Sequence, residues 1–508
     1  MGSDLESVTV SVEPQDRQDL APRPPLRGKA SLLLQHSRLH DIAETEAVEW
    51  LFSRMEAAAV PIVRKLDPGL DTLAGQDGVD LLDGPTRAPG VRAIKPPLQM
   101  HRPNFPTERP EPLSTHFAVL YSLVKSTKPW PIVLMARSLD LGGSERQLSE
   151  IAMALDPALF RVAVACFSAH GSRADELRRA QIPVVEFAIT SFAKPHAVVL
   201  AWAFVRWLRR RRAVIVHPFD VPTTLFAVPL ARIARVPVVL ASQRGDRRLF
   251  PWAYRRALRL TDRLADGLVL NSKYVRGVLS AEFGLRAERM HTLLNGVDTN
   301  VFHPAGRARR PELPAGGSVI GVVTVLRSEK SLETLLDAFA RLHEKSHQLV
   351  IVGDGPSKEA LLGRAQELKV ADRCVFVPAT FDVASWYRSI DVFVLPSTNE
   401  SFSNSLMEAM ACGCAVVASN IGGNPELVRH DDNGLLFEAG DASNLAHQLD
   451  RLLSDAVFRE SLASAAIRTI HARFTREVSA RRFAVFYEGM LRLKGLTTHH
   501  HDTDVVPR

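Results

Sequence analysis

Two glutamates, Glu400 and Glu408, form the most informative pattern in the sequence. Glu400 follows the apolar run VFVLP, and Glu408 lies eight positions later, beyond the polar run SFSNS. This order predicts a strand, a loop with Glu400, and a helix with Glu408 whose first backbone amides can meet an anion. Those amides belong to Ser403, Asn404, Ser405 and Leu406. A carboxylate can accept hydrogen bonds from two adjacent hydroxyls, so the pair suits a ribose or a sugar; the alternative is a capped helix with one exposed glutamate.

Two cations, Arg327 and Lys330, follow another apolar run, VIGVVTVL. The run predicts a strand, and the cations then lie in the loop before an amphipathic helix expected over 331–344. Ligands of open α/β sheets bind at the carboxyl ends of strands, so the two side chains are well placed for a diphosphate. Solvated surface charge is the alternative.

Gly142 and Gly143 follow the run PIVLMA, and a helix is expected from Ser144 to Ala154. Two glycines let a backbone approach a ligand closely, and the start of a helix favours an anion there. The segment lacks the GxGxxG fingerprint with a later acidic residue, which counts against a redox dinucleotide. Taken alone, it is equally compatible with a tight turn.

Composition limits the class of protein. A chain of 508 residues is longer than one core usually supports, which predicts two domains with additional segments. Its net charge of +7 suits a nucleotide, a polyphosphate or an anionic membrane. The four cysteines, without a CxxC pair, indicate neither a disulfide framework nor a metal site, and fit a reducing cytosol. We find no secretory leader and no apolar run of about 18 residues, so membrane contact is expected to be peripheral at most.

Short β-branched runs alternate with amphipathic stretches from Pro131 onward, a pattern typical of parallel sheets covered by helices. The predicted fold class is α/β with two Rossmann-like domains facing across a cleft. The expected divisions are an N-terminal extension with a partly disordered, partly helical sequence and a Pro-rich linker, a first and a second Rossmann-like domain, a terminal helix and a tail. Their ranges are 1–128, 129–302, 303–474, 475–495 and 496–508.

Over about residues 131–495 the chain resembles the retaining glycosyltransferases of family 4, which have the GT-B fold. The motifs that carry the resemblance are the two glutamates, LRSEK, LVIVGDGP with Gly353, LNGVDTNVFHP, EAMACGCAVVAS and GGNPELV. The resemblance implies that Glu400 holds donor sugar hydroxyls, Glu408 the ribose, and the basic pair the diphosphate. It also implies that the first domain is the acceptor side, that the second binds the donor, and that the terminal helix packs back on the first domain. The Gly142–Gly143 loop is then expected to approach the phosphates from across the cleft.

The sequence departs from the family pattern at two places. Val325 stands where many members have an arginine, so we expect Arg327 to take the phosphate role. After the run PVVLAS, where many members have a histidine, the chain has Ser242, Gln243 and Arg244. Arg244 is the candidate on the acceptor side. The resemblance implies front-face attack, with the donor phosphate receiving the acceptor proton, and without a metal ion or any other cofactor.

The acceptor is expected to be a glycan or a lipid-linked glycan of the cell surface. Residues 195–212 combine tryptophans with a run of arginines, which suits either an anionic membrane surface or a packed helix with a basic end. The expected location is cytoplasmic, at most peripheral at the inner face of the membrane, and no nucleic acid partner is expected. The alternative function is a nucleotide-sugar-binding subunit without turnover, which the missing histidine suggests.

Overall fold

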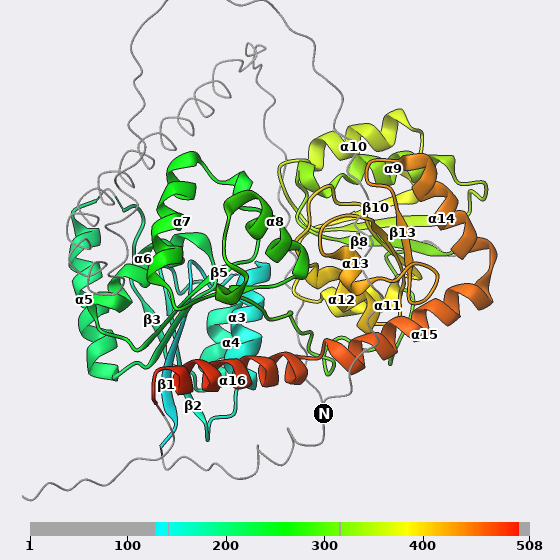
Figure 1. Ribbon diagram of the computed structural model, residues 1–508. Helices are drawn as coiled ribbons and strands as arrows, with labels where there is room; N and C mark the ends of the chain where they lie inside the picture. Colours follow the sequence, from blue (N-terminus) through cyan, green and yellow to red (C-terminus); the bar gives the residue numbers. More distant parts are fainter. Residues whose placement is uncertain (1–127, 141, 193, 314–315, 497–508) are drawn as a thin grey trace, which may run out of the picture.

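A computed structural model describes residues 128–140, 142–192, 194–313 and 316–496. The expected N-terminal extension with its Pro-rich linker, apart from residue 128, and all but the first residue of the expected tail lie outside these ranges. Two α/β domains lie side by side (Figure 1).

The first domain is built on a seven-stranded parallel sheet with the order β3-β2-β1-β4-β5-β6-β7. Its central strands are continuous apolar runs because both faces are covered by helices, as in α/β proteins generally. The strands are β1 (Trp130–Ala136), β2 (Phe160–Cys166), β3 (Val184–Glu186), β4 (Ile215–Pro218), β5 (Val238–Gln243), β6 (Gly267–Leu270) and β7 (Met290–Thr292). The covering helices are α3 (Gly143–Ala154), α4 (Ser172–Arg179), α5 (His196–Arg211), α6 (Val221–Ile233), α7 (Trp252–Leu264) and α8 (Lys273–Phe283).

The second domain has a six-stranded parallel sheet with the order β10-β9-β8-β11-β12-β13. Its strands are β8 (Val319–Val323), β9 (Gln348–Val352), β10 (Cys374–Val377), β11 (Val392–Leu395), β12 (Ala415–Ser419) and β13 (Leu435–Phe437). Its helices are α9 (Leu332–Arg341), α10 (Lys358–Glu367), α11 (Val383–Ser389), α12 (Asn404–Ala411), α13 (Asn424–Leu427), α14 (Ala442–Ser454) and α15 (Ala456–Arg473).

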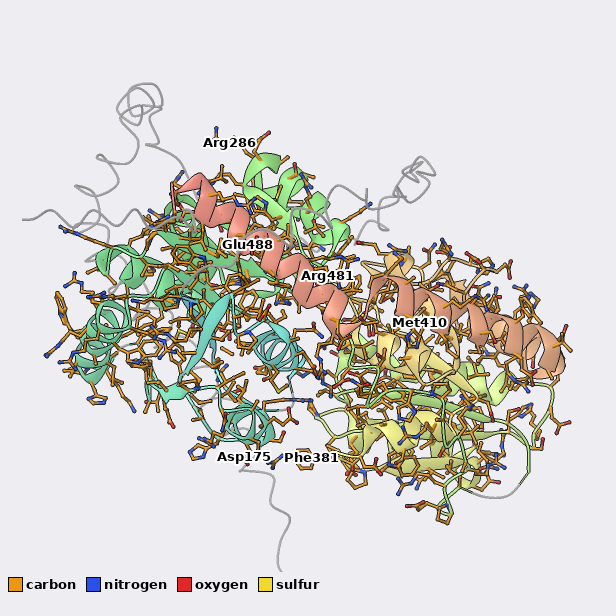
Figure 2. The ribbon with its side chains drawn as sticks, turned by 90° about the horizontal axis from the view of Figure 1, so that it is seen from below. Asp175, Arg286, Phe381, Met410, Arg481 and Glu488 are labelled. Carbon is orange, nitrogen blue, oxygen red and sulfur yellow. The ribbon has the colours of Figure 1, made fainter. Side chains whose placement is uncertain are left out.

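The last helix, α16 (Arg476–Leu493), leaves the second domain and packs on the first. Figures 1 and 2 show it running beneath the first domain, in line with α15. Its side chains Phe483 and Tyr487 are fully buried in the first domain's core. Thr475 accepts a hydrogen bond from the amide of Val478 and so caps the helix at its start.

The predicted fold class is confirmed: both sheets are parallel and each carries helices on its two faces. The ends of individual strands and helices differ from the expected ones. The last strand of the first domain ends at Thr292, and Val297 beyond it pairs with Thr475 instead of with the sheet. The helix expected over 331–344 spans Leu332–Arg341, and the helix expected from Ser144 begins at Gly143. Among the described helices, none combines the length and hydropathy needed to cross a bilayer.

Candidate functional site

A cleft lies between the carboxyl edges of the two sheets. In the first sheet the strand order reverses between β1 and β4, and in the second between β8 and β11, so each domain has a topological switch point. The cleft has a volume of about 530 Å³, which lies within the range of about 300–1,000 Å³ of small-molecule sites. Its walls contain loops from both domains, including those after β1, β5, β8 and β11.

The two loops at the second switch point bring Lys330 and Glu400 together. Nζ of Lys330 donates a hydrogen bond to Oε2 of Glu400 at 2.6 Å, and both side chains are mostly buried. Arg327 lies in the same wall, but 61% of its side chain is exposed and its nearest acidic partner, Glu329, is 3.9 Å away. This wall of the cleft therefore contains one paired cation, Lys330, and one, Arg327, that is largely free to approach a ligand.

The loop of Gly422 and Gly423 supports Glu400 from behind. The amide of Gly423 donates to the carbonyl of Glu400 at 3.1 Å. A Cβ added to Gly422, whose φ is +57°, would lie 1.8 Å from the same carbonyl oxygen. This loop, which begins the motif GGNPELV, lies outside the lining of the cleft because it packs on the backbone that carries Glu400.

The N-terminus of α12 faces the first domain. Ser403, Asn404 and Ser405 line the cleft, whereas Leu406 is fully buried beneath them and its amide donates to Oγ of Ser403 at 3.3 Å. The Asn404 side chain reaches across the cleft, where its Nδ2 donates to the carbonyl of Gly143 at 3.1 Å. This contact holds the start of α3 beside the start of α12, so two helix N-termini meet at one point.

Glu408 lies deeper in the cleft and already has two partners. It forms an ion pair with Arg146 of α3, and its Oε2 accepts from the hydroxyl of Tyr387 at 2.9 Å. Burial lowers the pKa of Arg146 and raises that of Tyr387 well above its ordinary value, so the hydroxyl stays a donor. A ligand hydroxyl that binds Glu408 must therefore share it with these two groups.

Arg244 stands on the opposite wall, at the end of β5. Its Nη1 donates to Oδ1 of Asn295 at 3.1 Å, and its guanidinium lies 4.7 Å from the ring centre of Phe219. Among the described residues, Nε and Nη2 of Arg244 are buried and have no hydrogen-bond partner. Burial lowers the pKa of Arg244 to about 10, so the group stays charged near neutral pH. An unsatisfied buried cation in a cleft wall favours an anionic ligand.

His217, at the end of β4, lies near Arg244 but behind the lining of the cleft. It is fully buried, with Nδ1 2.7 Å from the hydroxyl of Tyr487 and Nε2 2.8 Å from Oγ of Ser242. Burial and the charge of Arg244 hold its pKa well below 6.5, so the ring is neutral. This histidine links β4 and β5 to α16 and has no direct access to a ligand.

The other predicted glycines have different positions. Gly143 lines the cleft, but Gly142 does not; a Cβ there would meet the carboxylate of Glu145, the end of a side chain that can move. Gly353 lines the cleft with φ of +142°, and a Cβ would lie 1.9 Å from the carbonyl oxygen of Thr324. Glycine is needed here because the loop after β9 crosses close to the end of β8.

The sequence reasoning missed Arg146, Tyr387 and Asn295. All three line the cleft. Arg146 lies one turn after Gly143, so its place on α3 was a usable indication once a ligand was expected there. Asn295 belongs to the motif LNGVDTNVFHP, to which no role at the site was assigned, and Tyr387 lies on α11, outside the motifs.

Family models match both domains. The model described as Glycosyltransferase Family 4 matches residues 141–301, and the model described as Glycosyl transferases group 1 matches residues 307–469. The first match covers the domain that carries Gly143 and Arg244. The second covers the domain that carries Lys330, Glu400 and Glu408.

Two named relatives illustrate the similarity in sequence. N-acetyl-alpha-D-glucosaminyl L-malate synthase of Bacillus anthracis is 32% identical over 207 residues, which are 40% of this chain and 54% of the relative. A D-inositol 3-phosphate glycosyltransferase of Salinispora tropica is 36% identical over 231 residues, with 41% and 48% of the two chains covered. The chain thus spans about half the length of these relatives.

Solved structures share the two-domain fold. Alr3699/HepE of Anabaena in complex with UDP-glucose has a TM-score of 0.62 at 24% identity, with 71% of this chain and 99% of that chain covered. Sucrose-phosphate synthase of Thermosynechococcus elongatus has the same TM-score at 20% identity, with coverage of 72% and 100%. With a family model on each sheet and this GT-B fold, the chain belongs to the group 1 and family 4 glycosyltransferases.

Proposed function

We propose that the chain transfers a glycosyl group from a nucleotide diphosphate sugar to a glycan or lipid-linked glycan, with retention of the anomeric configuration. The observation that carries this proposal is the charge arrangement in the cleft. Lys330 and Arg327 lie on one wall, and Arg244, with two unpartnered nitrogens, lies on the other. The N-termini of α3 and α12 lie between them. Such a set of preorganised donors suits a leaving diphosphate.

Each group then has a role in binding the donor. Glu408 accepts from the ribose, and its partners Arg146 and Tyr387 fix the direction of its carboxylate. Lys330, Arg327 and the first amides of α12 bind the diphosphate, and the backbones at Gly143 and Gly353 allow close approach. Glu400, held by Lys330 at 2.6 Å, accepts from hydroxyls of the transferred sugar.

The transfer itself breaks the bond between the anomeric carbon and the diphosphate oxygen. The acceptor hydroxyl forms a new bond to the same carbon on the same face, and its proton passes to the departing phosphate oxygen. The charge that develops on the diphosphate is stabilised by the side chains of Lys330, Arg327 and Arg244, so we expect turnover without a divalent cation. Positioning of the two substrates supplies much of the remaining effect.

The relatives act on small acceptors according to their names, and two of the structural neighbours contain UDP or UDP-glucose. The nucleotides in these neighbouring structures support a nucleotide-sugar donor for this chain. A cell-surface glycan or its lipid-linked precursor is our proposed acceptor, which places the reaction on the cytoplasmic side of the membrane.

The test begins with a thermal-shift screen against UDP, GDP and ADP sugars, because a ligand that binds the native state raises the melting temperature. Turnover of the stabilising donor is then measured with and without EDTA. We expect Arg327→Ala and Lys330→Ala each to lose about 2 to 4 kcal/mol of transition-state stabilisation. Arg364→Ala, which removes an ion pair with Asp337 outside the cleft, is the matched control.

Two outcomes would contradict the proposal. Loss of turnover in EDTA would show that a metal ion supplies the charge assigned to the three cations. Donor binding without hydrolysis or transfer, with every acceptor tried, would favour a nucleotide-sugar-binding subunit.

A further inference from the structure

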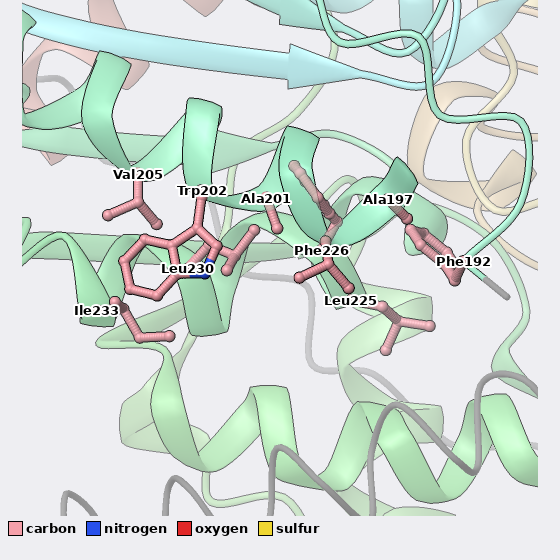
Figure 3. A pocket seen from close by; sticks show the side chains of 10 residues that line it. Phe192, Ala197, Ala201, Trp202, Val205, Leu225, Phe226, Leu230 and Ile233 are labelled. Atoms are coloured by element: carbon pink, nitrogen blue, oxygen red, sulfur yellow. The ribbon is translucent and has the colours of Figure 1, made fainter. Parts of the chain in front are cut away.

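An apolar groove lies between α5 and α6, on the outer surface of the first domain (Figure 3). Its walls are entirely carbon-rich side chains from these two helices and from Phe192. Phe192, Ala197 and Leu225 form one end, and Val205, Leu230 and Ile233 form the other. The groove is separate from the cleft described above, since the two share no lining residue.

The rim of this groove exposes unusually large apolar side chains. Trp202, which lines the groove, is 59% exposed, and its neighbours Val198 and Val199 are 45% and 62% exposed. Single exposed apolar residues are common, but a group of them beside an apolar groove marks a surface that binds something. In the described ranges, no other segment covers these three side chains.

The size of the groove favours side chains over a whole ligand. Its volume is about 200 Å³, below the range of about 300–1,000 Å³ in which small-molecule sites usually fall. A helix that lies along α5 can insert two or three apolar side chains into such a space.

The charge around the groove is of one sign. Neither α5 nor α6 contains an acidic residue, whereas Arg206, Arg209, Arg210 and Arg212 are exposed at the C-terminal end of α5. Arg209 donates to the carbonyl of Ile233 at 2.7 Å, which places this cation at the end of the groove. An occupant with an apolar stripe and an acidic flank would complement this surface.

The chain itself contains such a segment at residues 46–59, EAVEWLFSRMEAAA. Val48, Leu51, Phe52 and Met55 recur at i, i+3, i+4 and i+7, the spacing of one helical face. Glu49 and Glu56 are seven positions apart, so in a helix both lie along the same flank of that stripe. A helix of this length extends about 20 Å, and α5 itself about 24 Å.

The described part of the chain begins near the basic end of the groove. Pro129 lines a hollow together with Trp207, Arg210 and Arg212 of α5 and its C-terminal cap. Sixty-eight residues, 60–127, connect the segment to this point. A chain of that length can extend up to roughly 220 Å, so the connection is long enough to reach any point along α5. The tether also gives the segment a high effective concentration.

We propose that residues 46–59 form an amphipathic helix that lies in the groove between α5 and α6 of the same chain. Its apolar stripe covers Val198 and Trp202, and Glu49 and Glu56 face the arginines at the end of α5. The competing occupant is an anionic membrane, to which the same surface is also suited. The tethered segment is favoured because its apolar spacing and its acidic residues complement the groove and its arginines, and because it belongs to the same chain.

Cross-linking in the full chain tests the proposal. The photo-reactive residue p-benzoylphenylalanine replaces Trp202, which is exposed and therefore tolerant of the change. We expect a cross-link to residues 46–59, formed within one chain when isotopically labelled and unlabelled chains are mixed. The same residue in place of Val457, 79% exposed on α15 of the other domain, is the control and should give no such product.

Three outcomes would overturn the proposal: a cross-link between two chains, a cross-link to phospholipid from added phosphatidylglycerol vesicles in place of residues 46–59, or no product with that segment.

Charge reversal supplies a second measurement. Arg206→Glu with Arg210→Glu should lower the cross-link yield severalfold, and Glu49→Lys with Glu56→Lys should do the same. Combining the four changes should restore most of the yield, whereas Arg468→Glu on α15 should leave it unchanged. A lack of recovery in the combined variant would contradict the assigned charge contact.

Discussion

The carboxylate of Glu426, on α13 of the second domain, caps the N-terminus of α8 in the first. It accepts hydrogen bonds from the backbone amides of Lys273 at 3.0 Å and Tyr274 at 2.8 Å. These amides lack partners within their own helix, and a negative charge is favoured beside them. One side chain thus joins the two domains at the far side of the cleft.

Replacing this carboxylate should weaken the contact between the domains. We expect Glu426→Gln to lower the free energy of unfolding by about 1 kcal/mol, because the amide can accept at one atom only and carries no charge. Denaturant unfolding measures the change. Glu359→Gln, an exposed first-turn glutamate of α10 within one domain, should change it by less than about 0.5 kcal/mol. Equal effects of the two variants would show that the contact between domains contributes nothing.

Glu408 and Glu400 should differ in their effect on nucleotide binding. Glu408 is assigned to the ribose and Glu400 to the transferred sugar, so Glu408→Ala should weaken binding of the bare nucleotide diphosphate about 10-fold or more, and Glu400→Ala much less. Calorimetry gives both affinities. Glu408→Gln is the companion variant, because it can still accept from Tyr387 and leaves the volume unchanged. Equal losses for the two alanine variants would overturn the assignment.

His217 should contribute to the pH dependence of stability. Its pKa in the folded chain lies well below 6.5 because of burial and the nearby Arg244, whereas an unfolded histidine titrates near 6.5. The unfolded state therefore binds more protons below pH 6.5, and stability falls as the pH falls, by at most about 1.4 kcal/mol per pH unit for this group.

Urea unfolding between pH 7.5 and 5 measures this dependence. His217→Gln, which removes the titrating ring, should be less stable than the wild type at pH 7.5 and should lose less stability toward pH 5. The control is His471→Gln, on the exposed side of α15. Its free energy of unfolding should depend on pH as that of the wild type does. If His217→Gln and the wild type have parallel curves, the ring does not titrate as the structure implies.

Truncations at the two ends of the chain should have opposite effects on folding. Removing residues 1–125 should leave a cooperatively melting protein that binds its donor, because both described cores lie beyond that point. Removing residues 475–508 should abolish the cooperative transition, since Phe483 and Tyr487 are part of the first domain's core. Melting of both purified truncations with the preferred donor decides the matter. A stable C-terminal truncation would contradict the packing of α16.

Much of this architecture could be predicted because its cause is local. Runs such as IVLMA and VIVG are apolar throughout, and only strands buried on both faces require that. The positions of Lys330 and Glu400 followed from the same reasoning, since the loops at the ends of neighbouring parallel strands meet at one edge.

The rest depended on contacts between distant segments. The pairing of Arg146 with Glu408 joins two domains, and neither residue indicates the other by its spacing. Gly422 and Gly423 stand out in the sequence because glycine permits close approach, and the structure shows that the close approach is to the backbone of Glu400 and Ser401. A glycine pattern shows that something lies near, but the neighbour is identified only by the folded chain.

The position of α16 has a consequence for the order in which the chain can fold during synthesis. The ribosome releases the first domain's seven strands long before it releases Phe483 and Tyr487, which fill part of that domain's core and hold His217. The second domain, whose helices are consecutive through α15, is complete sooner after its own strands emerge. The domain translated first is therefore completed after the second, and its core stays incomplete until α16 has emerged from the ribosome.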